Sequence, residues 1–194
     1  STILKTDHKA RVTDVQISPD EEGEKQVSLD ILVISRELLI RLIREGSAKG
    51  ESDFDRCILQ SRCNDMKIFG YEYDGLIETI YSMQSYYQAN MDLLNPKARE
   101  VLFPANHPIY TKIRDEVPVK YGIDARTKNS LIADGCIVEG TVENSILFRG
   151  VVVKAGATVK NSIVMQGTVI GAKSEVNYVI ADKDVVVNDY RVAT

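Results

Sequence analysis

The stretch from Lys128 to Asn177, KNSLIADGCIVEGTVENSILFRGVVVKAGATVKNSIVMQGTVIGAKSEVN, returns repeatedly to one short phrase. Asn-Ser followed by apolar residues begins at Asn129, Asn144 and Asn161, so the phrase recurs every 15 to 17 residues. Asn177-Tyr178 echoes it before a further apolar run. Between the copies, apolar triplets such as CIV, ILF and VVV alternate with Gly, Ala, Asp and Lys. A fixed short period indicates a repeat architecture, because an ordinary β-sandwich has longer strands.

Each repeat holds about three six-residue units, each with an aliphatic residue that can point inward and a small residue near it. This arithmetic predicts a left-handed parallel β-helix over residues 129–194, with three short faces and three corners per coil. The aliphatic residues of successive coils then stack into one core. The Asn-Ser phrase marks one corner, because Asn tolerates unusual backbone angles and its amide can hydrogen-bond to the next coil.

The composition of the 194-residue chain is that of an ordinary globular protein, with 44% hydrophobic and 27% charged residues. No apolar run approaches the roughly 20 residues that a membrane helix needs, and the first residues lack a secretory pattern. A net charge of −4 without a basic tract argues against nucleic acid or an anionic membrane as the main partner. The three cysteines, with no metal-ligand spacing, are predicted to be free thiols in a reducing cytoplasm.

Residues 1–95 have the pattern of an incomplete α/β domain. Two alternating runs, at residues 2–7 and 11–18, predict a hairpin. The nearly continuous apolar run that begins at Val27 predicts a strand covered on both faces. Ser35 then caps a helix that Gly46 ends.

Three further elements are predicted before Pro96. A second helix starts after Asp53, and a short strand occupies residues 66–75. The longest helix covers Ile77 to Leu94, where apolar residues recur at spacings of three and four. Its tyrosines are expected to pack against a connector or a neighbouring subunit; they are Tyr81, Tyr86 and Tyr87.

Residues 96–128 are predicted to be a proline-broken connector. Prolines at positions 104, 108 and 118 interrupt every possible helix, while several large apolar residues remain. A free linker would be more polar, so this segment is expected to lie against the protein surface.

Two other classes of β-helix protein are disfavoured by the histidines. Acyltransferases and one class of carbonic anhydrase need histidines that project from the coils as a general base or as zinc ligands. The histidines of this chain are His8 and His107, and both lie outside the repeats. His107 is interpreted as a connector residue with a local hydrogen bond.

The phrases QANMDLL, PIYT, NSLIADGC and GTVENSILFRGV resemble the sugar-phosphate nucleotidyltransferases, and within them bacterial ADP-glucose pyrophosphorylase (glucose-1-phosphate adenylyltransferase). The resemblance extends from about Val12 onward. It implies that residues 1–95 are the C-terminal part of a Rossmann-like nucleotidyltransferase domain, followed by the connector and the β-helix. Full members of this family begin with a glycine-rich nucleotide loop. Nothing before Ser35 offers such a loop, so the chain resembles the C-terminal portion of the family.

The resemblance also carries three reaction motifs onto this chain, and each is altered here. The Glu and Lys that the family uses for the sugar and its phosphate become Ile17 and Ser18. A Gly that lets the sugar approach the backbone becomes Asp30, and a carboxylate that holds Mg²⁺ becomes Thr79. Removing one preorganised charge partner typically costs about 10²–10³ in rate. No catalytic residue and no metal or cofactor site is therefore predicted, although the family uses Mg²⁺.

This combination resembles the non-catalytic subunit of the family, often called the GlgD type. It implies a regulatory subunit of ADP-glucose pyrophosphorylase in glycogen synthesis, which assembles with a catalytic subunit into a hetero-oligomer, a tetramer. The alternative is a catalytic enzyme that converts ATP and glucose 1-phosphate to ADP-glucose and pyrophosphate. A second alternative is a non-enzymatic β-helix scaffold.

The family binds phosphorylated effectors near the junction of its two domains. Four cations at coil corners are the candidates for such a ligand, and they are Arg126, Lys128, Arg149 and Lys183. Solvated lysines that decorate a solenoid remain the alternative interpretation. Because terminal coils expose unpaired backbone and the end of the core, a subunit interface is expected to cover them.

Overall fold

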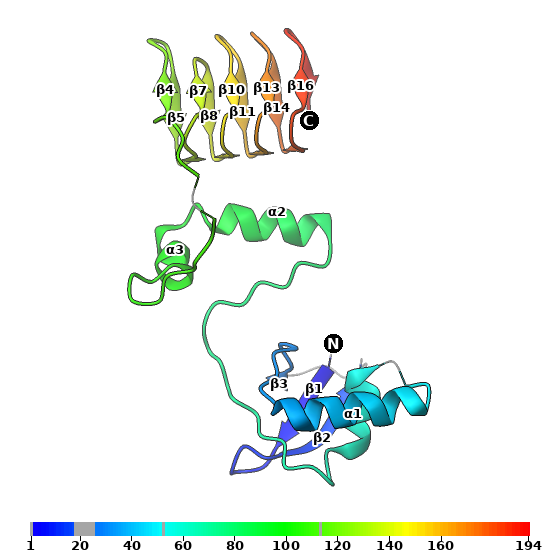
Figure 1. The fold of residues 1–194 in the computed structure, drawn as a ribbon. Helices are drawn as coiled ribbons and strands as arrows, with labels where there is room; N and C mark the ends of the chain where they lie inside the picture. Colours follow the sequence, from blue (N-terminus) through cyan, green and yellow to red (C-terminus); the bar gives the residue numbers. More distant parts are fainter. Residues whose placement is uncertain (1, 18–25, 52, 113) are drawn as a thin grey trace. The chain divides into compact units, whose positions relative to one another are not determined.

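The computed structural model describes residues 2–17, 26–51, 53–112 and 114–194 (Figure 1). The chain divides into two compact units, Ser1–Asp74 and Gly75–Thr194, and each is described by itself. Unit 1 contains a three-stranded sheet with helices, and unit 2 contains two helices and a β-solenoid. The predicted combination of an α/β segment with a C-terminal parallel β-helix is confirmed.

The sheet of unit 1 is antiparallel. Strands β1 (Thr2–Thr6) and β2 (Val12–Ile17) form the predicted hairpin, and β3 (Gln26–Val27) pairs with the other side of β1. The sheet order is therefore β2-β1-β3. Val12 and Val15 of β2 are 1% and 2% exposed and belong to one core cluster, because a register shift in the pairing with Lys5 and Thr6 interrupts the regular alternation between them.

Two helical segments complete unit 1. Helix α1 (Arg36–Ala48) begins where predicted, because the Ser35 Oγ accepts a hydrogen bond from the Leu38 backbone N–H. The π-helical turn η1 (Asp55–Gln60) follows the predicted position after Asp53. The small core of this unit combines residues of β2 and of the η1 region, namely Val12, Val15, Leu59 and Cys63, with Leu4, Phe54 and Ile68 packed against them.

Two of the strands predicted in this unit are wrong. The apolar run that begins at Val27 leaves the sheet at once, and Ile31 and Val33 are 80% and 103% exposed. Of residues 66–75, a single bridge at Phe69 is strand-like. A strand is held by its neighbours. Within the described residues, the ladder pairing of the first run ends at Val27, and the second segment pairs only through the bridge between Phe69 and Arg11.

Helix α2 (Met83–Asp92) in unit 2 is shorter than predicted, because its first turn is fixed by a cap. The Ser82 Oγ accepts a hydrogen bond from the Ser85 backbone N–H over 3.0 Å, and the Ser85 hydroxyl pairs with the Ser82 backbone in return. This capping box starts the helix at Ser82 rather than at Ile77. The apolar spacing continues before Ser82, but spacing alone does not set a helix boundary.

Helix α3 (Pro96–Leu102) lies in the predicted connector and corrects the statement that prolines interrupt every helix there. Pro96 occupies the first turn, where its missing N–H costs nothing. The Asn95 side chain accepts a hydrogen bond from the Lys97 backbone N–H over 3.0 Å and caps the helix. A proline at this position starts a helix instead of breaking it.

Three parallel sheets form the solenoid (Figure 1). The β10 sheet has the order β16-β13-β10-β7-β4, the β11 sheet β17-β14-β11-β8-β5, and the β12 sheet β15-β12-β9-β6. The strands are β4 (Lys120–Tyr121), β5 (Arg126–Lys128), β6 (Leu131–Ile132), β7 (Ile137–Val138), β8 (Thr141–Glu143), β9 (Ile146–Leu147), β10 (Val152–Val153), β11 (Thr158–Lys160), β12 (Ile163–Val164), β13 (Val169–Ile170), β14 (Glu175–Asn177), β15 (Ile180–Ala181), β16 (Val186–Val187) and β17 (Val192–Ala193).

The solenoid has four full coils, each with one strand in every sheet, and β16 and β17 belong to a fifth. Its first coil starts before residue 129, since Lys120 of β4 pairs in register with Ile137 and Arg126 of β5 pairs with Thr141. The first coil was hidden in the sequence because its strands carry Lys120, Tyr121 and Thr127 where the next coil carries Ile137, Val138 and Val142.

The predicted aliphatic stack fills the solenoid. Each coil contributes one inward residue from each sheet, and register pairing places it above its counterpart in the next coil. The inward residues of the three inner coils are at most 7% exposed, and they are Val138, Val153, Ile170, Val142, Val159, Val176, Leu147, Val164 and Ala181.

The Asn corner, between the β11 and β12 sheets, carries a ladder of amide hydrogen bonds. The Nδ2 atoms of Asn129, Asn144 and Asn161 donate to the Oδ1 atoms of Asn144, Asn161 and Asn177 over 2.8, 3.4 and 3.0 Å. The first three residues have φ angles of 43°, 46° and 46°. Both reasons given for Asn at this corner, the left-handed backbone and the bond to the next coil, are confirmed.

The fourth copy of the corner is shifted by one residue. Asn177 pairs in register with Lys160, so Tyr178 occupies the position that Asn161 has in the coil before. Tyr178 adopts a φ of 59° there, which is unusual for an aromatic residue. The Asn177 side chain still reaches back to complete the ladder.

A ladder of serines runs inside the Asn corner. The Oγ atoms of Ser130, Ser145 and Ser162 accept hydrogen bonds from the backbone N–H of Ser145, Ser162 and Val179 over 3.2, 3.1 and 3.1 Å. Ser145 and Ser162 are fully buried, so these bonds satisfy polar groups that water cannot reach. The Asn-Ser phrase therefore supplies two hydrogen bonds between neighbouring coils.

The second coil is two residues shorter than the others, and the difference lies at one corner. Only Glu139 and Gly140 connect β7 to β8, whereas four residues, 154–157, connect β10 to β11. A Cβ atom on Gly140 would lie 2.3 Å from the carbonyl oxygen of Ala157. The short spacing from Asn129 to Asn144 is thus made possible by a glycine at a tight corner.

Candidate functional site

Helix α2 meets the solenoid at the Asn corner. The Tyr87 hydroxyl donates a hydrogen bond to the Asn161 carbonyl oxygen over 2.8 Å, and the Tyr87 ring lies 6.4 Å from the Tyr178 ring. Figure 1 shows α2 running alongside the coils. Burial, with a smaller contribution from Tyr178, raises the pKa of the Tyr87 phenol. Of the three helix tyrosines, Tyr87 packs on the solenoid itself rather than on the connector.

We expect Tyr87→Phe to lower the free energy of unfolding by about 1 kcal/mol, because one partly buried hydrogen bond is lost. Since the pKa of Tyr87 is raised in the fold, its contribution is complete below the ordinary tyrosine value of 10.0 and is lost as the pH rises through the higher folded value. Urea unfolding at neutral and strongly alkaline pH measures both effects. Tyr86→Phe is the matched control, because the Tyr86 hydroxyl has no hydrogen-bond partner within the described residues, and an equal loss there would contradict the assignment.

The first coil ends in a groove of about 330 Å³. Lys128 reaches this groove from the end of β5, and the polar side chains of Thr127, Asn129 and Ser130 line it beside Lys128. The apolar part of the lining comes from Tyr121, Leu131 and Ile132. Here the strand edges of β4, β5 and β6 face away from the solenoid, since each is the last strand of its sheet. The groove is therefore an open coil end with one cation, Lys128, at its rim.

The charge of Lys128 is partly neutralised. Its Nζ atom lies 3.4 Å from the Glu143 Oε1 atom, and the Glu143 Oε2 atom lies 3.7 Å from the Lys160 Nζ atom. Arg126, two residues before Lys128 on β5, forms no ion pair within the part of the chain that the structure describes. Of Arg126 and Lys128, Arg126 is therefore the cation better placed to bind an anion.

The other two candidate cations lie at the Gly corner, which joins the β12 sheet to the β10 sheet and is marked by Gly135, Gly150 and Gly167. Arg149 and Lys183 occupy equivalent positions there, two coils apart, as the hydrogen bonds from Gly150 and Gly167 to the preceding coil show. The structure thus places the four candidates in two groups on different parts of the solenoid, rather than in one cluster.

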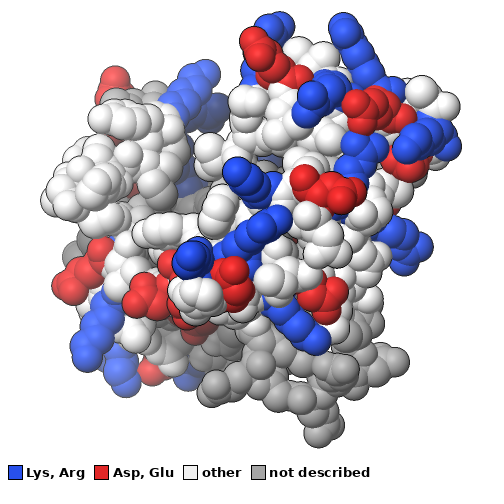
Figure 2. All heavy atoms as spheres, turned by 90° about the horizontal axis from the view of Figure 1, so that it is seen from below, with Lys and Arg blue, Asp and Glu red and all other residues white. Residues whose placement is uncertain are grey.

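The charged side chains on the face shown in Figure 2 are mixed, with Lys and Arg next to Asp and Glu. A phosphate ligand would have to be recognised by local geometry, because no broad positive field guides it to the described surface. Lys128 lines the groove, and Arg126 lies two residues before it on the same strand, so this pair combines two cations with a neighbouring concave surface.

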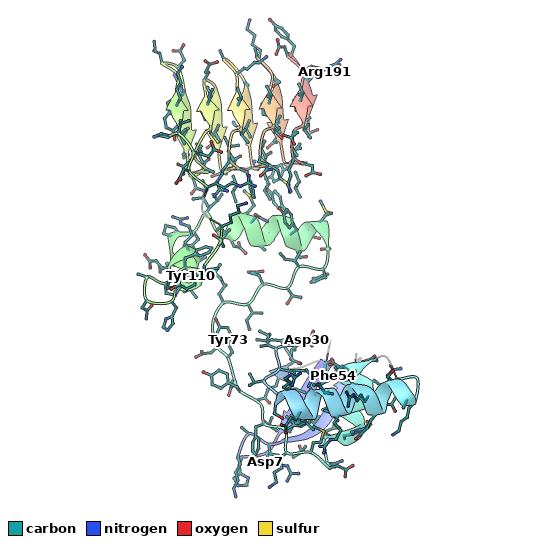
Figure 3. All side chains as sticks on the ribbon, in the orientation of Figure 1. Asp7, Asp30, Phe54, Tyr73, Tyr110 and Arg191 are labelled. Carbon is teal, nitrogen blue, oxygen red and sulfur yellow. The ribbon has the colours of Figure 1, made fainter. Side chains whose placement is uncertain are left out.

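The positions altered from the family motifs are distributed over both units. Ile17 ends β2 and is half-buried, and Ser18 lies outside the described residues. Asp30, labelled in Figure 3, is exposed and has a left-handed φ of 58°. Thr79 is exposed and belongs to unit 2. Whether these positions line one pocket stays a prediction.

Unit 1 has a groove of its own, of about 360 Å³, between α1 and the segment that follows η1. Arg62 Nη1 lies 2.6 Å from the Glu45 Oε2 atom, and this hydrogen bond is the main reason that the pKa of Glu45 is lowered. Arg41 and Lys49 line the same groove. The pairing of Glu45 with Arg62 makes this groove a structural contact between two helical segments.

Two negative observations apply to the described residues. They contain no group of three or more His, Cys, Asp or Glu side chains placed to hold a metal ion. None of their helices is long and apolar enough to cross a membrane.

Residues 117–193 match the family model described as GlmU-like, C-terminal hexapeptide, so the solenoid is a hexapeptide-repeat domain. Over 160 residues, or 82% of its length, the chain is 45% identical to the glycogen biosynthesis protein GlgD of Bacillus subtilis (strain 168), of which it covers 46%. It is 54% identical over 69 residues to GlgD of Geobacillus stearothermophilus, covering 36% of this chain and 20% of that protein.

A glucose-1-phosphate adenylyltransferase of Clostridium perfringens (strain SM101 / Type A) is 30% identical over 158 residues, which is 80% of this chain and 41% of that protein. The chain spans less than half of the length of each of these relatives. The resemblance to the ADP-glucose pyrophosphorylase family, and to its GlgD proteins in particular, is confirmed.

Sequence reasoning missed the junction of α2 with the Asn corner. The sequence feature that could have indicated it is Tyr178, which follows Asn177 where the earlier repeats have serine after asparagine. An aromatic residue at a corner that otherwise uses Asn indicates a contact with something outside the coil. It did not identify Tyr87 as the partner, because the two residues are far apart in the sequence.

Proposed function

We propose that the protein is a catalytically inactive, regulatory subunit of ADP-glucose pyrophosphorylase in glycogen synthesis. The observation that carries this proposal is the 45% identity to a GlgD protein over 82% of the chain. The altered motif positions support it: Ile17, Asp30 and Thr79 replace a sugar-binding carboxylate, a glycine and a metal-binding carboxylate in the resemblance. The lone hydroxyl of Thr79 is a poor substitute for a carboxylate ligand of Mg²⁺.

The subunit assembles with a catalytic partner through the open end of its first coil. Unpaired strand edges in β4, β5 and β6 offer backbone donors and acceptors to another chain. The groove beside them adds the Asn129 and Ser130 side chains. A partner that covers this end removes the exposed edges and closes a hetero-oligomer, a tetramer in this proposal.

The proposed effector is a phosphorylated metabolite. Arg126 and Lys128 meet it at the first coil, because guanidinium and ammonium groups bind phosphate oxygens through charge-assisted hydrogen bonds. Arg149 and Lys183 form a second, less enclosed pair at the Gly corner. Binding at the first coil lies next to the proposed subunit contact, so a ligand there can alter the partner's activity.

An adenylyl-transfer assay tests the proposal, with ATP and glucose 1-phosphate as substrates. The full-length protein is measured alone and mixed with a catalytic glucose-1-phosphate adenylyltransferase. We expect a turnover alone at least about 10²-fold below that of the catalytic enzyme, and a changed saturation curve in the mixture. Arg126→Gln with Lys128→Gln is expected to abolish the response to sugar phosphates while the mixture keeps its basal rate.

A second candidate function is catalysis itself, favoured by the 30% identity to a glucose-1-phosphate adenylyltransferase. Ordinary turnover by the full-length protein alone would establish it and refute the regulatory proposal. No effect in either arm would instead support a scaffold unrelated to this reaction.

A further inference from the structure

The outer face of the β11 sheet carries three charged side chains in one register column. Strand pairing places Glu143 of β8 beside Lys128 of β5 on one side and beside Lys160 of β11 on the other. The Glu143 Oε1 atom accepts a hydrogen bond from the Lys128 Nζ atom over 3.4 Å, and its Oε2 atom lies 3.7 Å from the Lys160 Nζ atom. One carboxylate therefore pairs with two ammonium groups, and one of these, Lys128, also lines the groove at the first coil.

The second cation beside this groove has a neutral neighbour instead. Arg126 pairs in register with Thr141, so no carboxylate stands across from it on β8. The two cations consequently differ, because Lys128 is engaged by Glu143 and Arg126 forms no ion pair within the described part of the chain. A phosphate can bind the guanidinium group without a rival, but it must compete with a carboxylate for the ammonium group.

We propose that Glu143 is an internal competitor that sets the affinity of the first-coil groove for phosphate, an inference that rests on the effector site of the proposed function. Without a ligand, the carboxylate occupies one of the three donors of Lys128. A bound phosphate takes Lys128 away from Glu143. The carboxylate then keeps Lys160, which lies in register on its other side.

Lys160 is the residue that makes this exchange favourable. Without it, the Glu143 carboxylate would lose its cationic partner at the moment when a second anion arrives beside it, and neighbouring like charges repel. The side chain of Glu143 is only 29% exposed, so water screens its charge incompletely. Lys160 is not part of the groove lining, yet it supports phosphate binding there because it keeps the competitor neutralised.

The competition tunes the groove and does not block it. The side chain of Lys128 is 79% exposed, and the pairing distances of 3.4 and 3.7 Å are long for charged groups. Pairs of this kind change an equilibrium constant by about 5-fold at most. We therefore expect the removal of Glu143 to strengthen phosphate binding by about that factor.

Titration of the 194-residue chain with inorganic phosphate at constant ionic strength tests the proposal. Binding is followed by the backbone amide chemical shifts of residues that line the groove, such as Thr127 and Leu131. Glu143→Gln keeps the size of the side chain and is expected to lower the dissociation constant about 5-fold. The gain should vanish when Lys128 is also replaced by Gln, since the freed ammonium group is its source.

Glu175→Gln is the matched control, because it removes the same charge from the same sheet face. Glu175 lies on β14, three strands from β5, or about 14 Å at the usual strand spacing. This distance exceeds the screening length of about 8 Å at physiological ionic strength, so the affinity should stay within about 1.5-fold of the wild type. Equal gains in Glu143→Gln and Glu175→Gln would show that net charge alone matters and would overturn the proposal.

Lys160→Gln provides a second and independent test. It should weaken phosphate binding about 3-fold in the wild-type background but have little effect once Glu143 is already Gln, because the competitor that it neutralises is gone. Equal weakening in both backgrounds would contradict this role.

Two further outcomes separate this inference from the proposed effector site. Binding that requires Lys128 but gains nothing from Glu143→Gln would refute the competition and leave the groove as the phosphate site. Amide shifts that stay unchanged in every variant would refute the groove and the competition together, whereas the regulatory role itself is tested by the adenylyl-transfer assay.

Discussion

Gly140→Ala is expected to lower the free energy of unfolding by about 3 kcal/mol. The added Cβ atom would lie 2.3 Å from the carbonyl oxygen of Ala157 and 2.9 Å from that of Lys154. Both are backbone atoms of the third coil, so neither can turn aside as a flexible side chain would. The coils must separate locally, which opens hydrogen bonds such as that from the Thr141 N–H to the Ala157 carbonyl. Chemical denaturation measures the loss.

Gly150→Ala provides the control, because a Cβ atom added there does not collide with a neighbouring coil. Gly150 has a φ of 68° and no atom near an added Cβ within 4 Å. Alanine there meets backbone strain alone, worth about 1 kcal/mol. If both variants lost the same stability, close approach between coils would not be what requires glycine at position 140.

Asn161→Asp is expected to cost about 2–3 kcal/mol at neutral pH. Asparagine at this position donates to the Asn177 Oδ1 atom over 3.0 Å, and a carboxylate would instead face that oxygen with no hydrogen to share. Aspartate has nearly the same size and tolerates the left-handed backbone, so the lost donor is the main change. Protonation of the new carboxyl at low pH would restore a hydrogen that can be donated to the Asn177 Oδ1 atom, so stability should recover as the pH falls.

Asn177→Asp is the matched control for the ladder. Asn177 accepts the bond from Asn161, and its own Nδ2 donates to no other described residue. A carboxylate keeps the accepting role, so stability at neutral pH should stay within about 0.5 kcal/mol of the wild type. Equal destabilisation by the two variants would show that the direction of the ladder is unimportant. Urea unfolding at two pH values decides between these outcomes.

The solenoid was predictable from sequence because its determinants are local and repeated. The repeated Asn-Ser phrase predicted one corner of each coil, and the aliphatic triplets predicted the stacked core. Even the irregular spacing between Asn129 and Asn144 was visible, although its cause, a two-residue corner at Gly140, required coordinates. The first coil was missed since it lacks the apolar repeat that identifies the others.

Unit 1 was less predictable because its elements depend on partners distant in sequence. The run after Val27 has the composition of a buried strand, yet its state is set by whether another strand lies beside it. In unit 2, the starts of helices α2 and α3 depended on the caps Ser82 and Asn95, which outweighed the apolar spacing. Local pattern identified the hairpin and α1, where the capping and pairing residues are adjacent in the chain.

The sequence predicted which kind of residue would form the candidate site, but not where those residues lie on the solenoid. Sequence alone identified Arg126, Lys128, Arg149 and Lys183 as corner cations, but Arg126 and Lys128 lie on strand β5, whereas Arg149 and Lys183 lie at the Gly corner. The coil register separates the first two from the others. The hydrogen bond from Tyr87 to Asn161 could not be predicted from the sequence, because no spacing pattern relates these two distant residues.

The amides of the Asn corner all point the same way, from the first coil toward the last. The ladder consequently has a direction. At its first tip the Asn129 Oδ1 atom is left as an acceptor, and at its last tip the Asn177 Nδ2 atom is left as a donor. A molecule that extends this chain of amides must present a donor at the first tip and an acceptor at the second. Two copies joined by like tips would therefore interrupt it, whereas two copies joined first tip to last tip would continue it.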